Sequence, residues 1–176
     1  LEHLGGRRAR LSKVYVVDLS PSLLDIARRR KDSLGWSNVE LVQADATTFT
    51  PPAGPVDIVT FSYSLTMIPD WFAAIDRAWE LLRPGGVIGV VDFHVSRKHP
   101  APGRTRHPWP TRALWPAWFA RDNVFLNPDH VEYLHHRFEP VHLSEQRAGI
   151  DHLPTARLPF YLFVGTKTLK TPESVH

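Results

Sequence analysis

Short apolar runs separated by helical patterns fill the first half of the chain. Segments rich in β-branched residues predict buried strands at residues 14–17, 39–43, 56–61 and 87–93. Helices are expected after Ser20-Pro21 and from about residue 71, because each start follows a capping residue and a later glycine is placed to end each helix. This alternation is typical of an α/β fold with a mostly parallel sheet that is covered on both faces.

The pattern changes in the second half of the chain. It first becomes rich in Pro, Arg, His and Trp, and the segment 96–127 is expected to be an insertion that forms a cap or lid on the substrate side. The last predicted elements are a helix near residues 128–137 and two strands at about residues 139–146 and 159–168. The short link between these strands favours an antiparallel pair, and we interpret residues 1–176 as a single domain.

The composition fits one globular domain. Hydrophobic residues make up 43% of the chain, which is too apolar for a disordered protein. No apolar run approaches the roughly 18 residues of a membrane-spanning helix and no leader precedes the first strand, so the sequence predicts a cytoplasmic protein. A formal charge of +3 is modest, and no nucleic-acid partner is expected. The absence of cysteine excludes a thiol nucleophile and thiolate metal ligands.

Polar residues follow three of the predicted strands directly. In open parallel sheets, ligands bind beyond the carboxyl ends of the strands. Asp18 is placed like the acidic residue that accepts hydrogen bonds from the ribose of a nucleotide cofactor, and Asp45 could accept from an adenine amino group. The stretch 61–67, "FSYSLTM", leaves the third strand with hydroxyl groups and a tyrosine. We therefore expect these strand ends to form the wall of one binding site.

Four blocks of sequence in order resemble the motifs of class I S-adenosylmethionine-dependent methyltransferases. They are "VYVVDLSPSLLDIARRR", "VELVQADATTF", "VDIVTFSYSLTMIPDW" and "LLRPGGVIGVVDF". The resemblance implies a Rossmann-like methyltransferase sheet with a terminal antiparallel strand pair and S-adenosyl-L-methionine as the cofactor. It implies that the cofactor is bound by residues at three strand ends, namely Asp18 and Leu19 at the ribose, Asp45 and Ala46 at the adenine, and Ser62 and Tyr63 near the methionine moiety.

A narrower resemblance extends into the second half. The blocks "FSYSLTMIPDWFAAIDRAWELLRPGGVIGVVDFHV", "WFARDNVFLNPDHVEYLHHRFE" and "ARLPFYLFVGTK" are similar to the methyltransferase part of betaine lipid synthases. That part of these enzymes trimethylates the amine of a diacylglyceryl-homoserine lipid. The resemblance therefore implies a lipid amine as the methyl acceptor.

The start of the chain departs from the family pattern. Class I methyltransferases carry a Gly-rich loop between their first strand and first helix, and no such loop precedes Asp18. The opening "LEHLGGRRARLSKV" resembles the tail of the first helix instead, and no initiator Met is present. We expect an N-terminally truncated domain that lacks the first strand and the Gly-rich loop.

Three residues are candidates for the chemistry. Methyl transfer to nitrogen requires a deprotonated amine held in line with the sulfonium methyl, and aromatic faces favour the cationic groups. Tyr63, Asp92 and His94 are therefore nominated as catalytic, although Tyr63 could equally be a packing residue and the other two a satisfied polar pair. Four histidines invite a metal hypothesis, but their spacing matches no zinc motif and no metal is expected: His130, His135, His136 and His142.

The segment 96–127 has two interpretations. Aromatic residues interleaved with arginines suit a lid that dips into a lipid surface, and they equally suit a cap packed over the active site. The residues concerned are Trp109, Trp115, Trp118 and Phe119 among Arg104, Arg106 and Arg112. Expected partners are a small-molecule or lipid acceptor amine and, for the first interpretation, the membrane surface; the oligomeric state is left open.

Other functions compete with this reading. The chain could methylate a soluble small molecule, or be a non-catalytic methyltransferase-like binding module. Asp18 alone would also fit a nicotinamide dehydrogenase, but the later blocks argue against that class.

Overall fold

The computed structural model describes residues 11–150 and 153–168. The contacts within it divide the chain into two units, of which one ends at Pro52 and the other begins at Ala53. The stretch 1–10, where the sequence predicts the tail of a helix, lies outside the described residues. Each unit is described by itself below.

The first unit is a strand, a helix and a second strand. Strand β1 (Val14–Asp18) pairs in parallel with β2 (Val39–Gln43), and helix α1 (Pro21–Ser33) connects them. Ser20 caps the helix, since its side chain accepts a hydrogen bond from the Leu23 amide. Gly35 follows the helix with a φ of +62°, a conformation that glycine adopts without steric cost. The predicted elements of this unit are confirmed to within about one residue at the strand ends.

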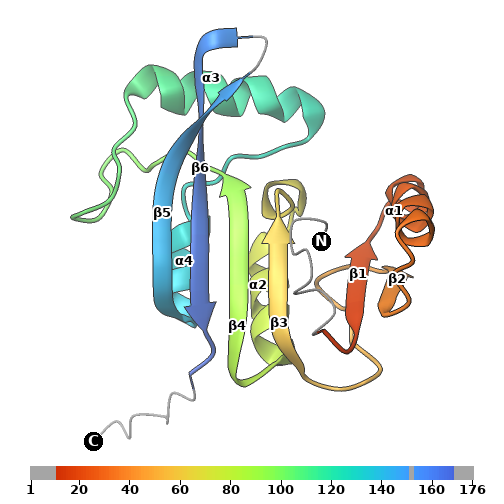
Figure 1. Cartoon of the computed structure of the whole chain (residues 1–176). Coiled ribbons are helices and arrows are strands. Elements are labelled where there is room, and N and C mark those ends of the chain that lie inside the picture. The colour runs from red at the N-terminus through yellow and green to blue at the C-terminus, as the bar shows by residue number, and fades with distance from the viewer. Residues whose placement is uncertain (1–10, 151–152, 169–176) are drawn as a thin grey trace, which may run out of the picture. The chain divides into compact units, whose positions relative to one another are not determined.

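The second unit contains a four-stranded mixed sheet (Figure 1). Its strands are β3 (Val56–Ser62), β4 (Leu82–Phe93), β5 (Glu139–Ile150) and β6 (Leu153–Thr166), in the order β3-β4-β6-β5. The pair β3–β4 is parallel, whereas β6 runs antiparallel to both β4 and β5. The predicted terminal antiparallel pair is therefore confirmed. The prediction of a mostly parallel sheet holds for the pairs β1–β2 and β3–β4. The four-stranded sheet as a whole is mixed.

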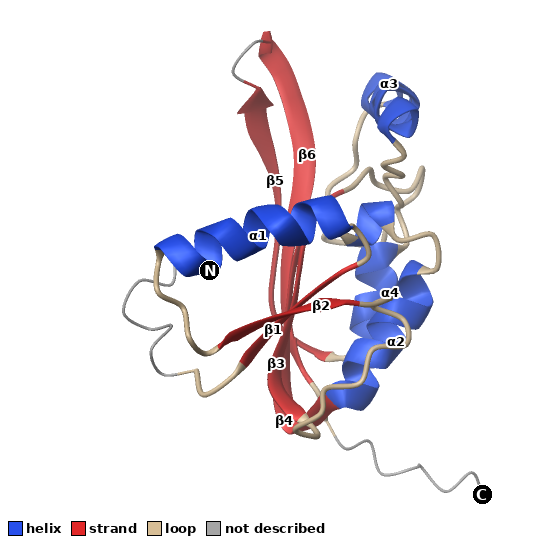
Figure 2. Ribbon diagram, turned by 90° about the vertical axis from the view of Figure 1, so that its right-hand side faces the viewer, coloured by secondary structure: helices blue, strands red, loops and turns tan. Residues whose placement is uncertain are grey.

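Helices α2 (Trp71–Leu81) and α4 (His130–Arg137) cover the same face of this sheet (Figure 2). Ile88 and Val90 of β4 point to that face and are almost fully buried, as are Ile75 of α2 and Leu134 of α4. Alternate residues of a strand share one face, which explains how two-residue spacing in β4 builds this core. The sequence predicts helices on both faces, but within this unit both of these packed helices lie on one.

Strand β4 begins earlier than its sequence predicts. The glycines at positions 85 and 86 are expected to end the preceding helix in a turn, yet Leu82 already pairs with Val56, and the register shifts before Ile58. Gly85 has a φ of +75°, and its amide donates to the Lys167 carbonyl at 2.9 Å. The turn thus becomes part of an irregular start of β4. The Lys167 carbonyl, just beyond β6, accepts the hydrogen bond that the Gly85 amide would otherwise lack.

The segment 96–127 contains a helix that its sequence pattern does not predict. Helix α3 (Trp109–Phe119) continues into a 3₁₀ turn, η3 (Ala120–Asp122), and lies near the carboxyl end of β4 (Figure 1). Reciprocal bonds between Ser96 and His107 close the loop that leads to it, with the Ser96 amide donating to Nδ1 at 3.0 Å and the His107 amide donating to Oγ at 2.8 Å. The role of this segment as a lid stays a prediction. No helix in residues 11–150 or 153–168 is long and apolar enough to cross a membrane.

Candidate functional site

Asp18 ends β1 beside the end of its parallel neighbour. It pairs with Gln43 in the ladder, and its carbonyl accepts from the Ala44 amide at 3.2 Å. Its Oδ1 accepts from the Ser20 amide at 2.8 Å, which directs the chain into α1. Among the described residues, Oδ2 of Asp18 has no hydrogen-bond partner. Leu19, the next predicted cofactor residue, is 64% exposed.

Asp45 lies at the same edge, two residues past the end of β2. Its Oδ1 accepts from both the amide and the hydroxyl of Thr47, each at 2.8 Å. These hydrogen bonds lower the pKa of the exposed Asp45 carboxyl, so that it is charged at neutral pH. Ala46 is half-buried behind it. The structure thus confirms that two acidic residues follow adjacent parallel strands, and their roles with a cofactor remain predictions.

Tyr63 leaves the end of β3 in an unusual conformation. Its φ is +51°, which is uncommon for a residue other than glycine, and its amide donates to the Val91 carbonyl at 2.8 Å. This backbone turns the side chain outward, where it is 43% exposed and its ring lies 4.6 Å from that of Phe93. Phe93 in turn stacks on Phe119 of α3 at 5.4 Å. Tyr63, Phe93 and Phe119 form an aromatic row, and the exposed Ser62 precedes it.

Asp92 is fully buried and holds the chain that follows Tyr63. Its Oδ1 accepts from the Thr66 hydroxyl and from the Phe93 amide, both at 2.8 Å, and its Oδ2 accepts from the Thr66 amide at 3.2 Å. Burial raises the pKa of the Asp92 carboxyl, against the opposing effect of these hydrogen bonds. The catalytic role predicted for Asp92 stays a prediction, and this geometry favours a positioning role for the 3₁₀ turn η2 (Leu65–Met67).

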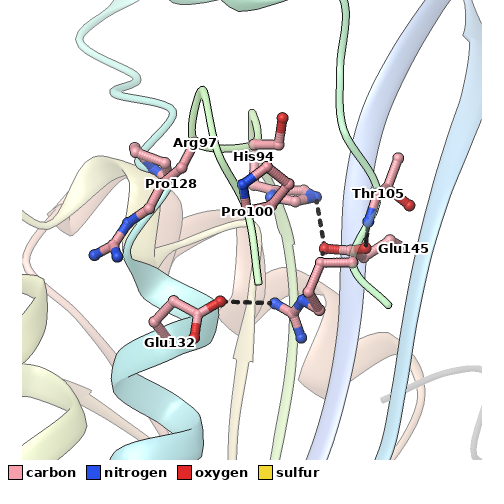
Figure 3. Close-up of a pocket in the computed structure, with 9 residues that line it drawn as sticks. His94, Arg97, Pro100, Thr105, Pro128, Glu132 and Glu145 are labelled. Atoms are coloured by element: carbon pink, nitrogen blue, oxygen red, sulfur yellow. Dashed lines mark hydrogen bonds and ion pairs between the residues drawn. The ribbon is translucent and has the colours of Figure 1, made fainter. Parts of the chain in front are cut away.

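His94 continues the same face of β4 into a small polar pocket (Figure 3). It is 3% exposed, and burial lowers its pKa to about 4, so the ring is neutral at pH 7. Its Nε2 lies 3.9 Å from a carboxylate oxygen of Glu145, a contact between a neutral ring and a charge at that pH. Arg104 lies 3.4 Å from the same carboxylate. The pocket, with a volume of about 10 Å³, has room for about one water molecule and none for an acceptor.

Two buried groups beside His94 are not apparent from the sequence motifs. Tyr161 pairs with Asp92 across the β4–β6 ladder, and its ring lies 5.5 Å from that of His94. The Tyr161 hydroxyl and both ring nitrogens of the fully buried His130 have no hydrogen-bond partner among the described residues. The sequence does contain one signal for a buried polar cluster here. The two-residue spacing of β4 places Asp92 and His94 on the same buried face as Ile88.

Histidines that the structure describes in the second unit pack against aromatic rings. In the part of the chain that the structure describes, no group of three or more His, Asp or Glu side chains is arranged to hold a metal ion. His130 packs against Trp71 at 4.7 Å, and His135 packs against Phe163 at 5.3 Å. These rings contribute to packing between α4 and its surroundings.

Comparison with known proteins assigns the fold. Residues 4–86 match the model of a family described as a methyltransferase domain. The ubiquinone/menaquinone biosynthesis C-methyltransferase UbiE of Escherichia coli is 33% identical over 82 residues, which cover 46% of this chain and 33% of UbiE. A demethylmenaquinone methyltransferase of Oceanobacillus iheyensis is 28% identical over 80 residues, 46% of this chain and 34% of that protein. The chain thus spans about a third of the length of these curated relatives.

Solved structures support the same assignment of the fold. A protein of Bacillus halodurans that is named as a methyltransferase superposes with a TM-score of 0.74 at 17% identity, covering 95% of this chain and 88% of that one. The N-methyltransferase NodS of Bradyrhizobium japonicum, in complex with S-adenosyl-L-homocysteine, has a TM-score of 0.61 at 17% identity, with 88% and 66% covered. The enzyme class and the cofactor expected from the sequence agree with these matches. The chain therefore has the fold of the class I S-adenosylmethionine-dependent methyltransferases.

Proposed function

We propose that this chain is the methyltransferase domain of an enzyme that uses S-adenosyl-L-methionine. The observation that carries the proposal is the pair of carboxylates, Asp18 and Asp45, that follow adjacent parallel strands within the matched residues 4–86. Carboxylates at such strand ends are suited to accept hydrogen bonds from a nucleoside. The matches to methyltransferases support the same cofactor.

The carboxylates fit a nucleoside in their local geometry. Each uses Oδ1 to fix its own turn, so the carboxylate is held in place before a ligand arrives. Oδ2 of Asp18 remains available to the ribose hydroxyls, with Leu19 exposed beside it. Asp45 and Ala46 would lie at the adenine. The bound cofactor supplies an activated methyl group, and the protein's task is to hold it and to exclude water.

For the acceptor, we favour the amino head group of a homoserine-derived lipid. The sequence blocks of the second half support this choice through their resemblance to betaine lipid synthases. The aromatic row of Tyr63, Phe93 and Phe119 supports it independently, since a quaternary ammonium product is attracted to aromatic faces by about 0.5–2 kcal/mol each. The hydroxyl of the exposed Tyr63 can accept a hydrogen bond from the acceptor amine, whereas His94 is enclosed.

A second acceptor class is favoured by the relatives. UbiE is named for ubiquinone and menaquinone biosynthesis and the Oceanobacillus iheyensis protein for demethylmenaquinone, and a quinone ring would also stack on the aromatic row. In that case the methyl group would be transferred to a ring carbon. The two candidates differ in the atom that is methylated and in the number of methyl groups gained.

The test uses methyl-labelled S-adenosyl-L-methionine and two sets of vesicles, one with diacylglyceryl-homoserine and one with demethylmenaquinone. Mass spectrometry then counts the methyl groups. Stepwise gains of up to three on the lipid amine support the favoured acceptor, and a single gain on the quinone supports the second. Transfer to neither, with the cofactor bound, rejects both acceptors and leaves the fold and cofactor assignments standing.

A further inference from the structure

Helix α3 turns an apolar face to solvent. Trp109, Leu114 and Trp118 are 72%, 67% and 60% exposed; at 3.6 residues per turn Leu114 lies within the exposed half of the helix, and Trp109 and Trp118 lie at its two edges, about 180° apart. We call these three residues the α3 stripe. The other residues exposed on this side are also apolar, namely Pro110, Ala113 and Ala117. A surface helix normally presents polar residues to water, and a contiguous apolar patch of this kind marks an interaction site.

The opposite side of α3 is anchored to the domain. Trp115 and Phe119 are partly buried, and the Phe119 ring stacks on Phe93 at the end of β4. The Val124 amide donates to the Phe119 carbonyl at 3.1 Å, and the Phe125 amide donates to the Thr66 carbonyl at 2.7 Å. The stripe therefore faces outward because the helix is held from its other side.

Basic residues predominate around the stripe, and the exposed Asp122, directly after Arg121, is the acidic residue next to it. Residues 93–121 contain six Lys and Arg residues and no Asp or Glu, whereas the whole chain carries a formal charge of only +3. Arg106 precedes α3 and Arg121 follows it, both exposed and without an ion pair among the described residues. A basic rim around an apolar face complements an anionic surface that also has an apolar interior.

A groove opens at the amino-terminal end of the stripe. It has a volume of about 430 Å³ and is lined by Arg106, His107, Pro108, Trp109 and Arg112. Two guanidinium groups beside an exposed indole suit a phosphate at the headgroup level of a bilayer, where Trp is enriched. This feature favours lipid over a protein partner, which would have to supply both acidic and apolar groups in the same pattern.

We propose that α3 docks on an anionic membrane surface, with the α3 stripe in the interfacial layer and Arg106 and Arg121 at the lipid phosphates. An α-helix of 11 residues is about 16 Å long, so it lies in the plane of the interface. The docked face is opposite the aromatic row, so that α3 separates the membrane from the end of β4. This surface is independent of the methyl-transfer proposal, since it requires neither cofactor nor acceptor.

The experiment is co-sedimentation with vesicles of phosphatidylglycerol and phosphatidylcholine in equal parts, compared with vesicles of phosphatidylcholine alone. The chain is expected to sediment with the anionic vesicles, to shift its Trp emission to the blue, and to bind less at raised salt. The double variant Leu114→Glu/Trp118→Glu should lower the partition coefficient by about tenfold or more. Arg106→Gln/Arg121→Gln should weaken binding and reduce its dependence on salt.

Val141→Glu is the matched control. Val141 is 65% exposed and lies at the irregularity between Pro140 and His142 in β5, so the change adds a charge without burying it. Circular dichroism melts check that every variant folds. No sedimentation with anionic vesicles, or equal sedimentation of wild type and stripe variant, overturns the proposal. Lipid-free self-association that only the stripe variant abolishes, without vesicle binding, would assign the stripe to a second copy of the chain instead.

Discussion

Thr66 and Asp92 are joined by two hydrogen bonds across 26 positions of sequence: the Thr66 hydroxyl donates to Oδ1 at 2.8 Å and its amide donates to Oδ2 at 3.2 Å. Both residues are buried, at 2% and 0% exposure. The two hydrogen bonds hold η2 at the end of β4. They thereby help to determine where the chain leaves β3 at Tyr63. The position of the exposed Tyr63 in the aromatic row thus depends on a buried polar contact.

Replacing Thr66 by Val tests this contact, because it removes the hydroxyl donor at nearly constant volume. A buried hydrogen bond to a carboxylate contributes about 1.5–3 kcal/mol, so the free energy of unfolding should fall by that amount. Urea denaturation measures the change. Thr60→Val, at an exposed position of β3, is the control and should be close to neutral. Equal stability of the Thr66 variant and wild type would contradict the role of the pair.

The lowered pKa values of two buried histidines predict that the protein loses stability in acid. Burial lowers the pKa of His94 and of His130 from 6.5 to about 4. Because the native state then binds fewer protons than the unfolded state, stability is complete above pH 6.5 and falls as the pH drops toward 4. One such histidine contributes a slope of up to about 1.4 kcal/mol per pH unit.

The variant His130→Phe isolates this effect. Its free energy of unfolding should vary less steeply between pH 6.5 and pH 5 than that of wild type, as measured by urea denaturation at fixed ionic strength. His99→Gln, which replaces a histidine at an exposed position, is the comparison variant. An unchanged slope in His130→Phe would mean that this ring does not take up a proton on unfolding.

Tyr63→Phe separates chemistry from binding. If the hydroxyl acts on the acceptor amine, turnover should fall by at least about tenfold while the dissociation constant for the cofactor stays within about twofold. The aromatic row keeps its ring in this variant, so packing is preserved. Tyr133→Phe is the control, since it removes a hydroxyl that donates to Asp76 at 2.8 Å and should lower stability without changing turnover. Unaltered turnover in Tyr63→Phe would reduce this residue to a packing role.

The sequence predicts the first unit well because its local signals agree with one another. Val14–Asp18 and Val39–Gln43 are β-branched runs, and Ser20 and Gly35 mark the helix between them. The adjacency of the strand ends at Asp18 and just before Asp45 follows from parallel pairing alone and is confirmed. The roles of these residues with a cofactor do not follow from the strand pattern, because the contacts that define a role belong to the complex.

Helix α3 and the orientation of Asp92 show where sequence patterns fail. Pro110 and Pro116 lie within α3, and its exposed face is apolar, so neither propensity nor amphipathic spacing indicates a surface helix there. Asp92 is a carboxylate at a strand end, its catalytic role stays a prediction, and the two-residue period of β4 directs its side chain inward with Val90. In both cases tertiary contacts decide, through Phe119 on Phe93 and through Thr66 on Asp92.

The measurement that tests the central claim most directly is calorimetric titration with S-adenosyl-L-homocysteine. The account predicts that the wild-type chain binds and that Asp18→Asn weakens binding by about 10-fold to 100-fold, the range expected for hydrogen bonds to a charged group. Asp25→Asn is the control, because Asp25 is exposed on α1 and pairs with Arg28; it should bind like wild type. Absence of binding by wild type, or equal affinity of the Asp18 and Asp25 variants, would contradict the claim that this strand edge holds the cofactor.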